Sequence, residues 1–364
     1  MLARATTSDE NTAGMNKSAR VGPQLSLIEA MMEPEFYPHL CEQVELRETL
    51  MSWLLFAGEF VYKVKKPVSF SFCDAATPAK RYRLCQDEVR LNRRLARDVY
   101  LSISGITVEK GKYTLINDAA ETKRGIQEFA VVMQRLPSHW MLDQMVTNRS
   151  ATLSDIQELA KRLVGFHTAA PIAKAKTWGS AQAIMRLITS NLEEAHQVAA
   201  DSLTRDILAA VERYARRYLI THQQSFDNRA RDGRVREGHG DLRCESICFG
   251  DKGLAILDCV ESDEGLRYGD VASELASLTV DFDLLGRPDL AHELMETYAA
   301  ESKDPQLFEF RHFYQCYRAV QRGRLEMLAS LQTELPLTQR LVARSNAKRL
   351  FSLAQGYAGT RYIS

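Results

Sequence analysis

The stretch Gly238–Phe249, GHGDLRCESICF, and the run Leu254–Gly265, LAILDCVESDEG, decide how this chain is interpreted. Asp241 stands in a polar turn ahead of an apolar pair, and a second acid, Asp258, ends a short apolar run. A loop, a strand, a hairpin turn and a second strand can bring two such acids into one cleft. A β-hairpin with ordinary surface acids explains the spacing equally well, because acids are common in turns.

Two acids in this order suit phosphoryl transfer. That chemistry needs one carboxylate at the acceptor hydroxyl and another that holds magnesium on the nucleotide phosphates. Asp241 fits the first role and Asp258 the second.

Four segments taken together make the case more specific. They are SWLLFAGEFVYKVKKPVSF (52–70), EVRLNRRLA (88–96), VVMQRLP (131–137) and GHGDLRCESICF. With them the chain resembles the aminoglycoside phosphotransferase-like kinases, a branch of the protein-kinase-like fold, over residues 22–330. The resemblance implies a bilobal α+β fold, with a small N-terminal lobe of antiparallel sheet plus helix (23–137) and a mostly helical C-terminal lobe (138–364) that carries both loops. ATP with Mg²⁺ is then expected between the lobes.

The resemblance also implies roles for single residues. Asp241 becomes the catalytic base and Asp258 the magnesium ligand, while His239 pins the loop by hydrogen bonding. Lys63, which shares one face of its strand with Lys65, becomes the phosphate-binding lysine. Glu88 on the following helix orients it. Arg243 stands where many related kinases carry histidine, and by its own charge it is expected to place positive charge near the transferring phosphoryl group.

Further contacts to the nucleotide are expected from two segments. The turn Glu48–Ser52 has no glycine, so Thr49 and Ser52 either contact phosphate or cap strand ends. In VVMQRLP, Met133 lines an adenine pocket and backbone groups of Gln134 pair with the base, or the segment is simply an apolar strand that runs into a linker. ATP and GTP are not distinguished.

One position departs from the family pattern. Ser246 stands where related enzymes commonly carry asparagine as a second metal ligand, so a weaker second metal site or an inactive nucleotide binder becomes plausible. Glu245 and Glu261 are nearby carboxylates that offer a replacement ligand, although we favour ordinary solvated surface acids for both.

Composition limits the class of partner. Of the 364 residues 45% are apolar, and Lys plus Arg equal Asp plus Glu at 47 each. No global charge therefore selects nucleic acid or an anionic membrane, and no apolar run approaches the roughly 20 residues of a spanning helix. A small-molecule substrate and a cytoplasmic location are expected, with residues 1–22 as a disordered tail lacking a signal sequence.

Periodicity places the elements. It predicts strands at 44–46, 52–56, 60–64, 103–108, 113–116 and 129–133, and a helix over 77–96. Beyond 137 it predicts helices near 152–166, 181–199, 202–224, 270–284, 288–302 and 306–332, with a hairpin at 247–260. Thr152 and Asp155 resemble a capping box.

Several other polar residues are interpreted as structural. His167 is expected in the core and Asp270 at a helix N-cap that braces the metal loop. The basic run Arg229, Arg231, Arg234 and Arg236 is taken as a solvated face rather than an attractant for a phosphorylated substrate. The seven cysteines lack CxxC spacing and are expected as reduced thiols, with zinc binding at Cys244, Cys248 and Cys259 a minor alternative.

Two rival functions stay open. A pseudokinase would bind nucleotide and act through a partner protein, and a nucleotidyl transferase would leave AMP on its product. Some relatives continue into a P-loop kinase domain, whose GxxxxGK[ST] motif does not occur here, so this chain would act alone or find that domain in trans. Glu261, Asp263 and Glu264 would suit an amino-bearing substrate or are ordinary loop acids, and the sequence does not identify the substrate.

Overall fold

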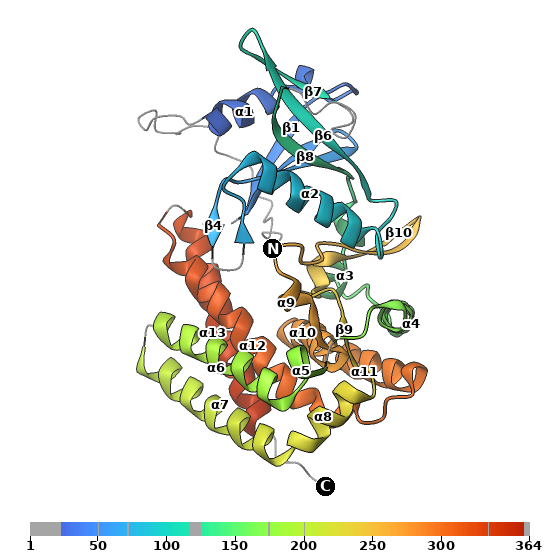
Figure 1. Ribbon diagram of the computed structural model, residues 1–364, viewed down its shortest axis with the longest axis vertical. Coiled ribbons are helices and arrows are strands. Elements are labelled where there is room, and N and C mark those ends of the chain that lie inside the picture. Colours follow the sequence, from blue (N-terminus) through green and yellow to red (C-terminus); the bar gives the residue numbers. More distant parts are fainter. Residues whose placement is uncertain are drawn as a thin grey trace. The chain divides into compact units, whose positions relative to one another are not determined.

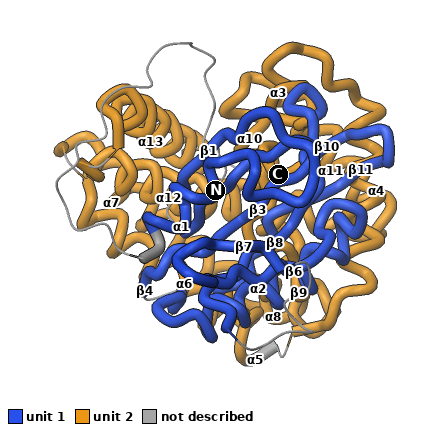
Figure 2. The backbone as a smooth tube through the Cα atoms, turned by 90° about the horizontal axis from the view of Figure 1, so that it is seen from above, with its two compact units in different colours: residues 1–140, 248–263 blue, residues 141–247, 264–364 orange. Residues whose placement is uncertain are grey.

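The computed structural model describes residues 23–49, 51–70, 73–116, 125–173, 175–199, 201–333 and 335–359. The predicted tail at 1–22 lies outside these residues. The chain divides into two compact units (Figure 2), which we call the sheet unit, Met1–Trp140 with Cys248–Asp263, and the helical unit, Met141–Ile247 with Glu264–Ser364. The division falls after Trp140 rather than at 137, and the segment that carries Asp258 groups with the sheet unit although we expected it in the C-terminal lobe.

The sheet unit is built on six antiparallel strands in the order β1-β2-β3-β8-β6-β7. Their bounds are β1 Val44–Glu48, β2 Ser52–Ala57, β3 Phe60–Lys65, β6 Tyr100–Glu109, β7 Lys112–Ile116 and β8 Ile126–Gln134. All six expected strands are therefore confirmed. Two shorter strands, β4 Ser69–Phe70 and β5 Cys73–Asp74, pair with each other.

Strand β2 is buried along its whole length. Trp53 and Leu55 pack with Met31 of helix α1 (Pro23–Met31), whereas Leu54 and Phe56 belong to a separate cluster on the opposite face. Successive side chains of a strand point to opposite faces, so this central strand has both faces covered. A short 3₁₀ helix, η1 (Pro34–Phe36), follows α1.

Helix α2 (Pro78–Asn92) fixes the second face of the sheet (Figure 1). Thr77 caps it by accepting a hydrogen bond from the N–H of Lys80, and a buried ion pair between Arg81 and Glu128 ties it to β8. The helix ends four residues before the predicted Ala96. The side chain of Asn92 bonds to the carbonyl of Glu88 and to the N–H of Cys259, which binds the helix end to the second segment of the unit.

That second segment carries the hairpin of β10 (Ile247–Gly250) and β11 (Gly253–Ile256), as predicted. Gly253 has φ +96° in the turn, a conformation that favours glycine. The N–H of Ile256 donates to the carbonyl of Leu95, so the hairpin is joined to the region after α2. The 3₁₀ helix η2 (Ser138–Trp140) ends the first segment of the sheet unit.

The helical unit holds most of the remaining elements. Its helices are α3 Leu142–Thr147, α4 Leu153–Ala169, α5 Ala175–Trp178, α6 Ala181–Val198, α7 Ser202–Thr221, α8 Gln223–Arg231, α9 Glu264–Arg267, α10 Val271–Leu284, α11 Pro288–Ser302, α12 Leu307–Leu331 and α13 Leu337–Gly359. A 3₁₀ helix, η3 (Cys244–Ser246), and the paired strands β9 (Val235–Glu237) and β12 (Tyr268–Asp270) complete it.

Local signals explain several helix ends. The capping box of α4 is present, with Thr152 and Asp155 bonding each other's backbone. The single helix expected over 202–224 is two, because the chain turns at His222 between α7 and α8. Helix α13 was not anticipated. No helix of the described ranges is long and apolar enough to cross a bilayer.

Candidate active site

Asp258 is held in an unusual backbone conformation after β11. Its φ is +64°, in the left-handed region that non-glycine residues seldom adopt. Its N–H donates to the hydroxyl of Tyr100 at 3.1 Å, and the next N–H, of Cys259, donates to Oδ1 of Asn92 at 2.9 Å. Strained backbone that its surroundings enforce is concentrated at functional sites, which makes Asp258 a candidate.

Two lysines and three carboxylates form one chain of ion pairs in the sheet unit. Nζ of Lys63 lies 2.8 Å from Oδ1 of Asp258 and 2.7 Å from Oε1 of Glu88. Nζ of Lys65 lies 2.6 Å from Oε2 of Glu88 and also pairs with Glu261. Both lysines therefore point to the α2 face, as their spacing on the strand predicted, and Glu88 bridges them.

These groups keep each other charged. Burial alone would lower the pKa of Lys63, but Asp258 and Glu88 raise it well above its usual value. Burial alone would raise the pKa of Asp258 and of Glu88, but Lys63 lowers both, with the help of Lys65 at Glu88. The expectation that Glu261 is a solvated surface acid is wrong, because its carboxylate is 15% exposed and paired with Lys65.

The turn before β2 uses one of its two expected hydroxyls locally. Oγ1 of Thr49 accepts from the N–H of Ser52 at 2.9 Å and donates to the carbonyl of Ser52 at 3.0 Å. This is the strand-end cap that was one of the two alternatives. Ser52 is 1% exposed, and its Oγ makes no hydrogen bond to the described residues. Phosphate contacts from Thr49 and Ser52 stay a prediction.

Part of the backbone at the end of β8 is already hydrogen-bonded within the sheet unit. Met133 packs against Leu54, Phe56 and Val61, which gives an apolar surface. The N–H of Gln134, however, donates to the carbonyl of Val99 at 2.9 Å. Base pairing by Gln134 would therefore have to use its carbonyl group.

In the helical unit, helix α10 holds both ends of the loop that carries Asp241. Near one end, Glu274 accepts hydrogen bonds from the N–H groups of His239 and Gly240, the latter at 2.7 Å. Two helical turns later, Asp281 accepts from the N–H of Cys244 at 2.8 Å. His239 contributes its backbone N–H to this contact, and pinning of the loop by its side chain stays a prediction. The sequence interpretation missed Glu274 and Asp281, although their spacing of seven residues, which places them on one face of a helix rich in apolar residues, was a usable signal.

Glycines allow this close approach. A Cβ on Gly238 would lie 2.4 Å from Oε2 of Glu274, and Gly240 has φ +91°. Neither position tolerates a larger residue without moving the loop.

A buried network fixes Glu274 in turn. Its Oε2 lies 2.5 Å from Nε2 of His167, whose Nδ1 lies 2.8 Å from the hydroxyl of Tyr298. Burial would raise the pKa of Glu274, but the His167 hydrogen bond and nearby charges lower it to about 2. His167 is thus a core histidine, as predicted.

Asp241 itself is surrounded by arginines. Burial would raise its pKa, but Arg243, Arg322 and Arg318 lower it, so the carboxylate is ionised near neutrality. Nη1 of Arg318 donates to the carbonyl of Gly240 at 3.1 Å, and Nη2 of Arg322 lies 2.5 Å from Asp281. Among the hydrogen bonds of the described residues, none involves the Asp241 carboxylate, which leaves it able to accept one from a ligand.

Two expectations about charged neighbours need correction. Glu245 is not a solvated surface acid, because it pairs with Nη1 of Arg243 at 2.6 Å and burial raises its pKa. The basic run is a solvated face only at Arg231, which is exposed. Arg229 is 1% exposed and donates hydrogen bonds to the carboxylates of Asp270 and Asp304. Arg234 and Arg236 donate hydrogen bonds to backbone carbonyls. Asp270 does cap α10, as predicted, by accepting from the N–H of Ala272.

Among the described residues, metal ligands do not form a preassembled cluster. In the parts of the chain that are described, no group of three or more His, Cys, Asp or Glu side chains converges on a metal site. Asp258 belongs to the sheet unit, whereas Ser246 is buried in the helical unit. Cys244, Cys248 and Cys259 are buried and form no disulfide with any described residue, and burial raises the pKa of Cys248 to about 11.

The chain is similar to known proteins over most of its length. A model of the family described as "Phosphotransferase enzyme family" matches residues 60–311. The uncharacterized proteins Mb2027c of Mycobacterium bovis (strain ATCC BAA-935 / AF2122/97) and Rv2004c of Mycobacterium tuberculosis (strain ATCC 25618 / H37Rv) are each 32% identical over 284 residues. That alignment covers 78% of this chain and 54% of each relative, so the chain spans about half the length of these curated relatives.

Solved structures match the fold. A choline/ethanolamine kinase family protein from Mesorhizobium loti has a TM-score of 0.50 at 14% identity, covering 91% of this chain and 98% of that one. The amicoumacin kinase hAmiN, in complex with AMP-PNP, Ca²⁺ and Ami, also has a TM-score of 0.50, at 11% identity over 91% and 93% of the two chains. The predicted α+β, protein-kinase-like fold is confirmed.

Proposed function

The chain belongs to the phosphotransferase enzyme family, and on that basis we propose that it transfers the γ-phosphoryl group of ATP, with Mg²⁺, to a hydroxyl group of a small molecule. The observation that carries this proposal is the placement of Lys63 between Glu88 and Asp258, at 2.7 and 2.8 Å. A buried ammonium group fixed by two carboxylates is suited to hold phosphate oxygens, and the carboxylate that shares it is suited to hold the metal.

Asp241 is proposed as the residue that orients the acceptor hydroxyl or accepts its proton. Two features support this role. Its loop is braced through backbone N–H groups by Glu274 and Asp281, and its carboxylate is kept ionised by neighbouring arginines. Positioned general bases contribute about 10²–10⁴-fold to rates. Arg243 is proposed to stabilise charge on the transferring phosphoryl group.

The residues fit magnesium. Mg²⁺ in such enzymes is bound by one or two carboxylates together with substrate phosphates and water, rather than by a full protein cage. Asp258 offers an ionised carboxylate, since Lys63 lowers its pKa well below the usual range. Asp258 would hold the ion, with the Ser246 hydroxyl as a second oxygen ligand. The ion would neutralise charge on the nucleotide phosphates.

On the nucleotide side, the apolar surface that Met133 shares with Leu54 and Phe56 supports a place for the adenine ring. Gln134 would contribute its carbonyl oxygen, since its N–H already bonds Val99.

The test is calorimetric ATP binding with and without Mg²⁺, with ATP consumption followed in the same samples. We expect the wild type to bind in a Mg²⁺-dependent manner and to turn ATP over, if only slowly. Asp258→Asn should lose the Mg²⁺ dependence, whereas Asp251→Asn, an exposed acid in the turn of the same hairpin, should retain it. Binding that ignores both the metal and Asp258 would refute the proposed site.

A second candidate is a pseudokinase that binds nucleotide and acts through a partner protein. Two observations favour it: the Thr49 hydroxyl is used within its own turn, and position 246 carries serine where related enzymes commonly carry asparagine. Nucleotide binding without any phosphoryl transfer in the same experiment would select this alternative.

A further inference from the structure

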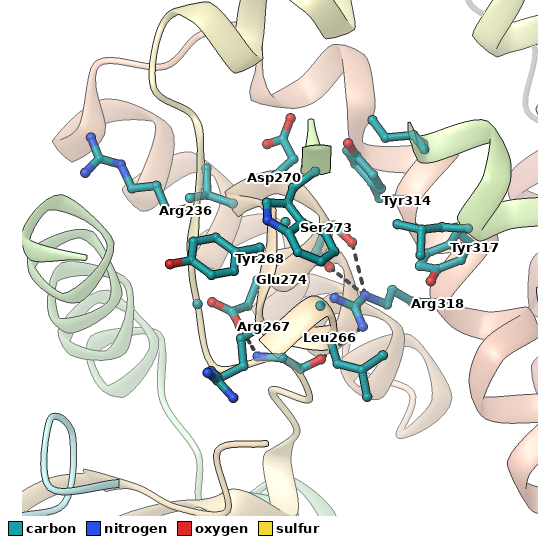
Figure 3. Close-up of a pocket in the computed structure, with 18 of the residues that line it drawn as sticks. Arg236, Leu266, Arg267, Tyr268, Asp270, Ser273, Glu274, Tyr314, Tyr317 and Arg318 are labelled. Carbon is teal, nitrogen blue, oxygen red and sulfur yellow. Dashed lines mark hydrogen bonds between the residues drawn. The ribbon is translucent and has the colours of Figure 1, made fainter. Parts of the chain in front are cut away.

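A pocket within the helical unit reaches the loop that carries Asp241 (Figure 3). It lies among α5, α6, the segment 265–270, the start of α10, and α12, and the backbone of Gly240 forms part of its lining. Its cavity volume is about 70 Å³, roughly the space of five water-sized spheres. A single ring or a short polar chain fills such a space.

Aromatic side chains form its walls. Trp178 and Tyr268 stack with ring centroids 5.9 Å apart and planes 11° from parallel. Tyr314 and Tyr317 of α12 lie on the opposite side from Tyr268 (Figure 3). Flat apolar faces on two sides favour a ligand that itself contains a ring.

Arg318 connects the pocket with the catalytic loop. Its Nε donates to the carbonyl and to Oγ of Ser273, both at 3.1 Å, and its Nη1 donates to the carbonyl of Gly240 at 3.1 Å. Among the hydrogen bonds of the described residues, none uses Nη2 of Arg318. A guanidinium nitrogen can only donate hydrogen bonds. Nη2 of Arg318 therefore favours a ligand with an oxygen acceptor.

The carboxylates that line the described pocket are already committed. Glu274 accepts from His167 and from the N–H groups of His239 and Gly240. Asp270 accepts hydrogen bonds from Nε and Nη2 of Arg229, and from the N–H of Ala272 in the helix that it caps. An ammonium group in this pocket would meet guanidinium charge without an uncommitted acid to pair with, which is unfavourable in a partly buried site.

We propose that this pocket is the acceptor subsite of the phosphotransferase, and that it selects a ring-bearing alcohol that is neutral or acidic rather than an amine. The assignment of the pocket as an acceptor subsite rests on the proposed function. The preference for a neutral or acidic ligand does not. It argues against an amino-bearing substrate, which the sequence had left open.

The preference is testable without nucleotide. The chain has three tryptophans, and Trp53→Phe with Trp140→Phe leaves Trp178 as the only fluorescent indole. Titrating this variant with D-glucose, D-glucuronate and D-glucosamine compares a neutral, an acidic and a cationic group on one ring. We expect saturable changes in Trp178 emission with the first two, and binding of the amine weaker by about tenfold or more.

Variants separate binding in the pocket from general effects. Tyr317→Leu should abolish the response, Tyr317→Phe should retain most of it, and Tyr214→Leu on α7, outside the pocket, should leave it unchanged. Equal or tighter binding of D-glucosamine overturns the selectivity, and no saturable change with any of the three sugars overturns the subsite. If sugars bind but ATP is never consumed, the pocket inference stands and the proposed function fails. If ATP is consumed on an acceptor while Trp178 stays silent, the reverse holds.

Discussion

The two candidate clusters of charge are built in different ways. In the sheet unit, Lys63 already engages Glu88 and Asp258, so each functional group is also a structural partner of another. In the helical unit, Glu274 and Asp281 hold the loop through backbone N–H groups. The Asp241 carboxylate takes no part in those hydrogen bonds.

The difference indicates at which residues a substitution changes function without changing the stability of the fold. Removing one member of a buried ion pair leaves an uncompensated charge, so the sheet-unit cluster should couple function to folding. Changing Asp241 leaves every described tie of its loop in place. Function and folding should therefore separate in the helical unit.

The largest expected effect is on turnover in Asp241→Asn. If Asp241 acts on the acceptor hydroxyl, ATP consumption should fall by about 10²–10⁴-fold, while thermal stability and ATP affinity stay unchanged. Steady-state kinetics, thermal unfolding and calorimetry of one preparation check this. Asp232→Asn is the control. Full activity in Asp241→Asn would remove the residue from the mechanism, and a large loss of stability would break the comparison.

The next effect concerns Lys63→Met and Lys65→Met. Each change leaves buried carboxylates without their charged partner, and breaking such a pair costs about 3–5 kcal/mol of unfolding free energy. Both lysines bond Glu88, so both variants should be destabilised in urea unfolding. ATP affinity should fall further in Lys63→Met, since only Lys63 also contacts Asp258. Equal losses of affinity would contradict the assignment of Lys63 as the phosphate-binding lysine.

Acid should weaken the helical unit through Glu274. Its pKa is lowered from 4.5 to about 2, so its contribution to stability is fully present above pH 4.5 and is lost as pH falls toward 2. The shift corresponds to about 3 kcal/mol. Urea unfolding over this pH range should show a steeper loss in the wild type than in Glu274→Gln. The exposed control Glu296→Gln should follow the wild type, and identical pH profiles for all three proteins would refute the role of Glu274.

The smallest effect is expected at a surface ion pair. Arg90 and Asp87 of α2 pair at 2.7 Å with side chains 62% and 37% exposed. Solvent-exposed pairs of this type contribute about 0.5 kcal/mol or less. Arg90→Ala should hence shift the urea midpoint only slightly. A loss as large as that of Lys63→Met would mean that burial does not distinguish the two kinds of pair.

Several elements were predictable because their causes are local. The strands at Ser52–Ala57 and Phe60–Lys65 are rich in aromatic and apolar residues and flank a glycine turn. The capping box of α4 needs only Thr152 and Asp155. Helix α13 escaped prediction because much of its buried face is made of small residues such as Ala343, Ala347 and Ala354, which give a weak periodic signal.

The candidate site was predicted in part. Lys63, Glu88 and Asp258 do converge, although their roles stay a prediction. Glu261 and Arg229 were misjudged as surface charges. Glu261 pairs with a lysine 196 positions away, and Arg229 with an aspartate 41 positions away. No local pattern in the sequence identifies such partners.

By itself the sequence determined the strands, most helices, the two acids of the loops and the resemblance to a kinase-like family. These depend on residue type and on spacings of a few positions, which set backbone conformation and periodicity. Only the tertiary structure decided that α10 holds the Asp241 loop, that Glu88 bridges two lysines, and that the acids of the pocket are already paired. Those facts depend on which distant side chains are brought within hydrogen-bond distance, and folding alone determines that.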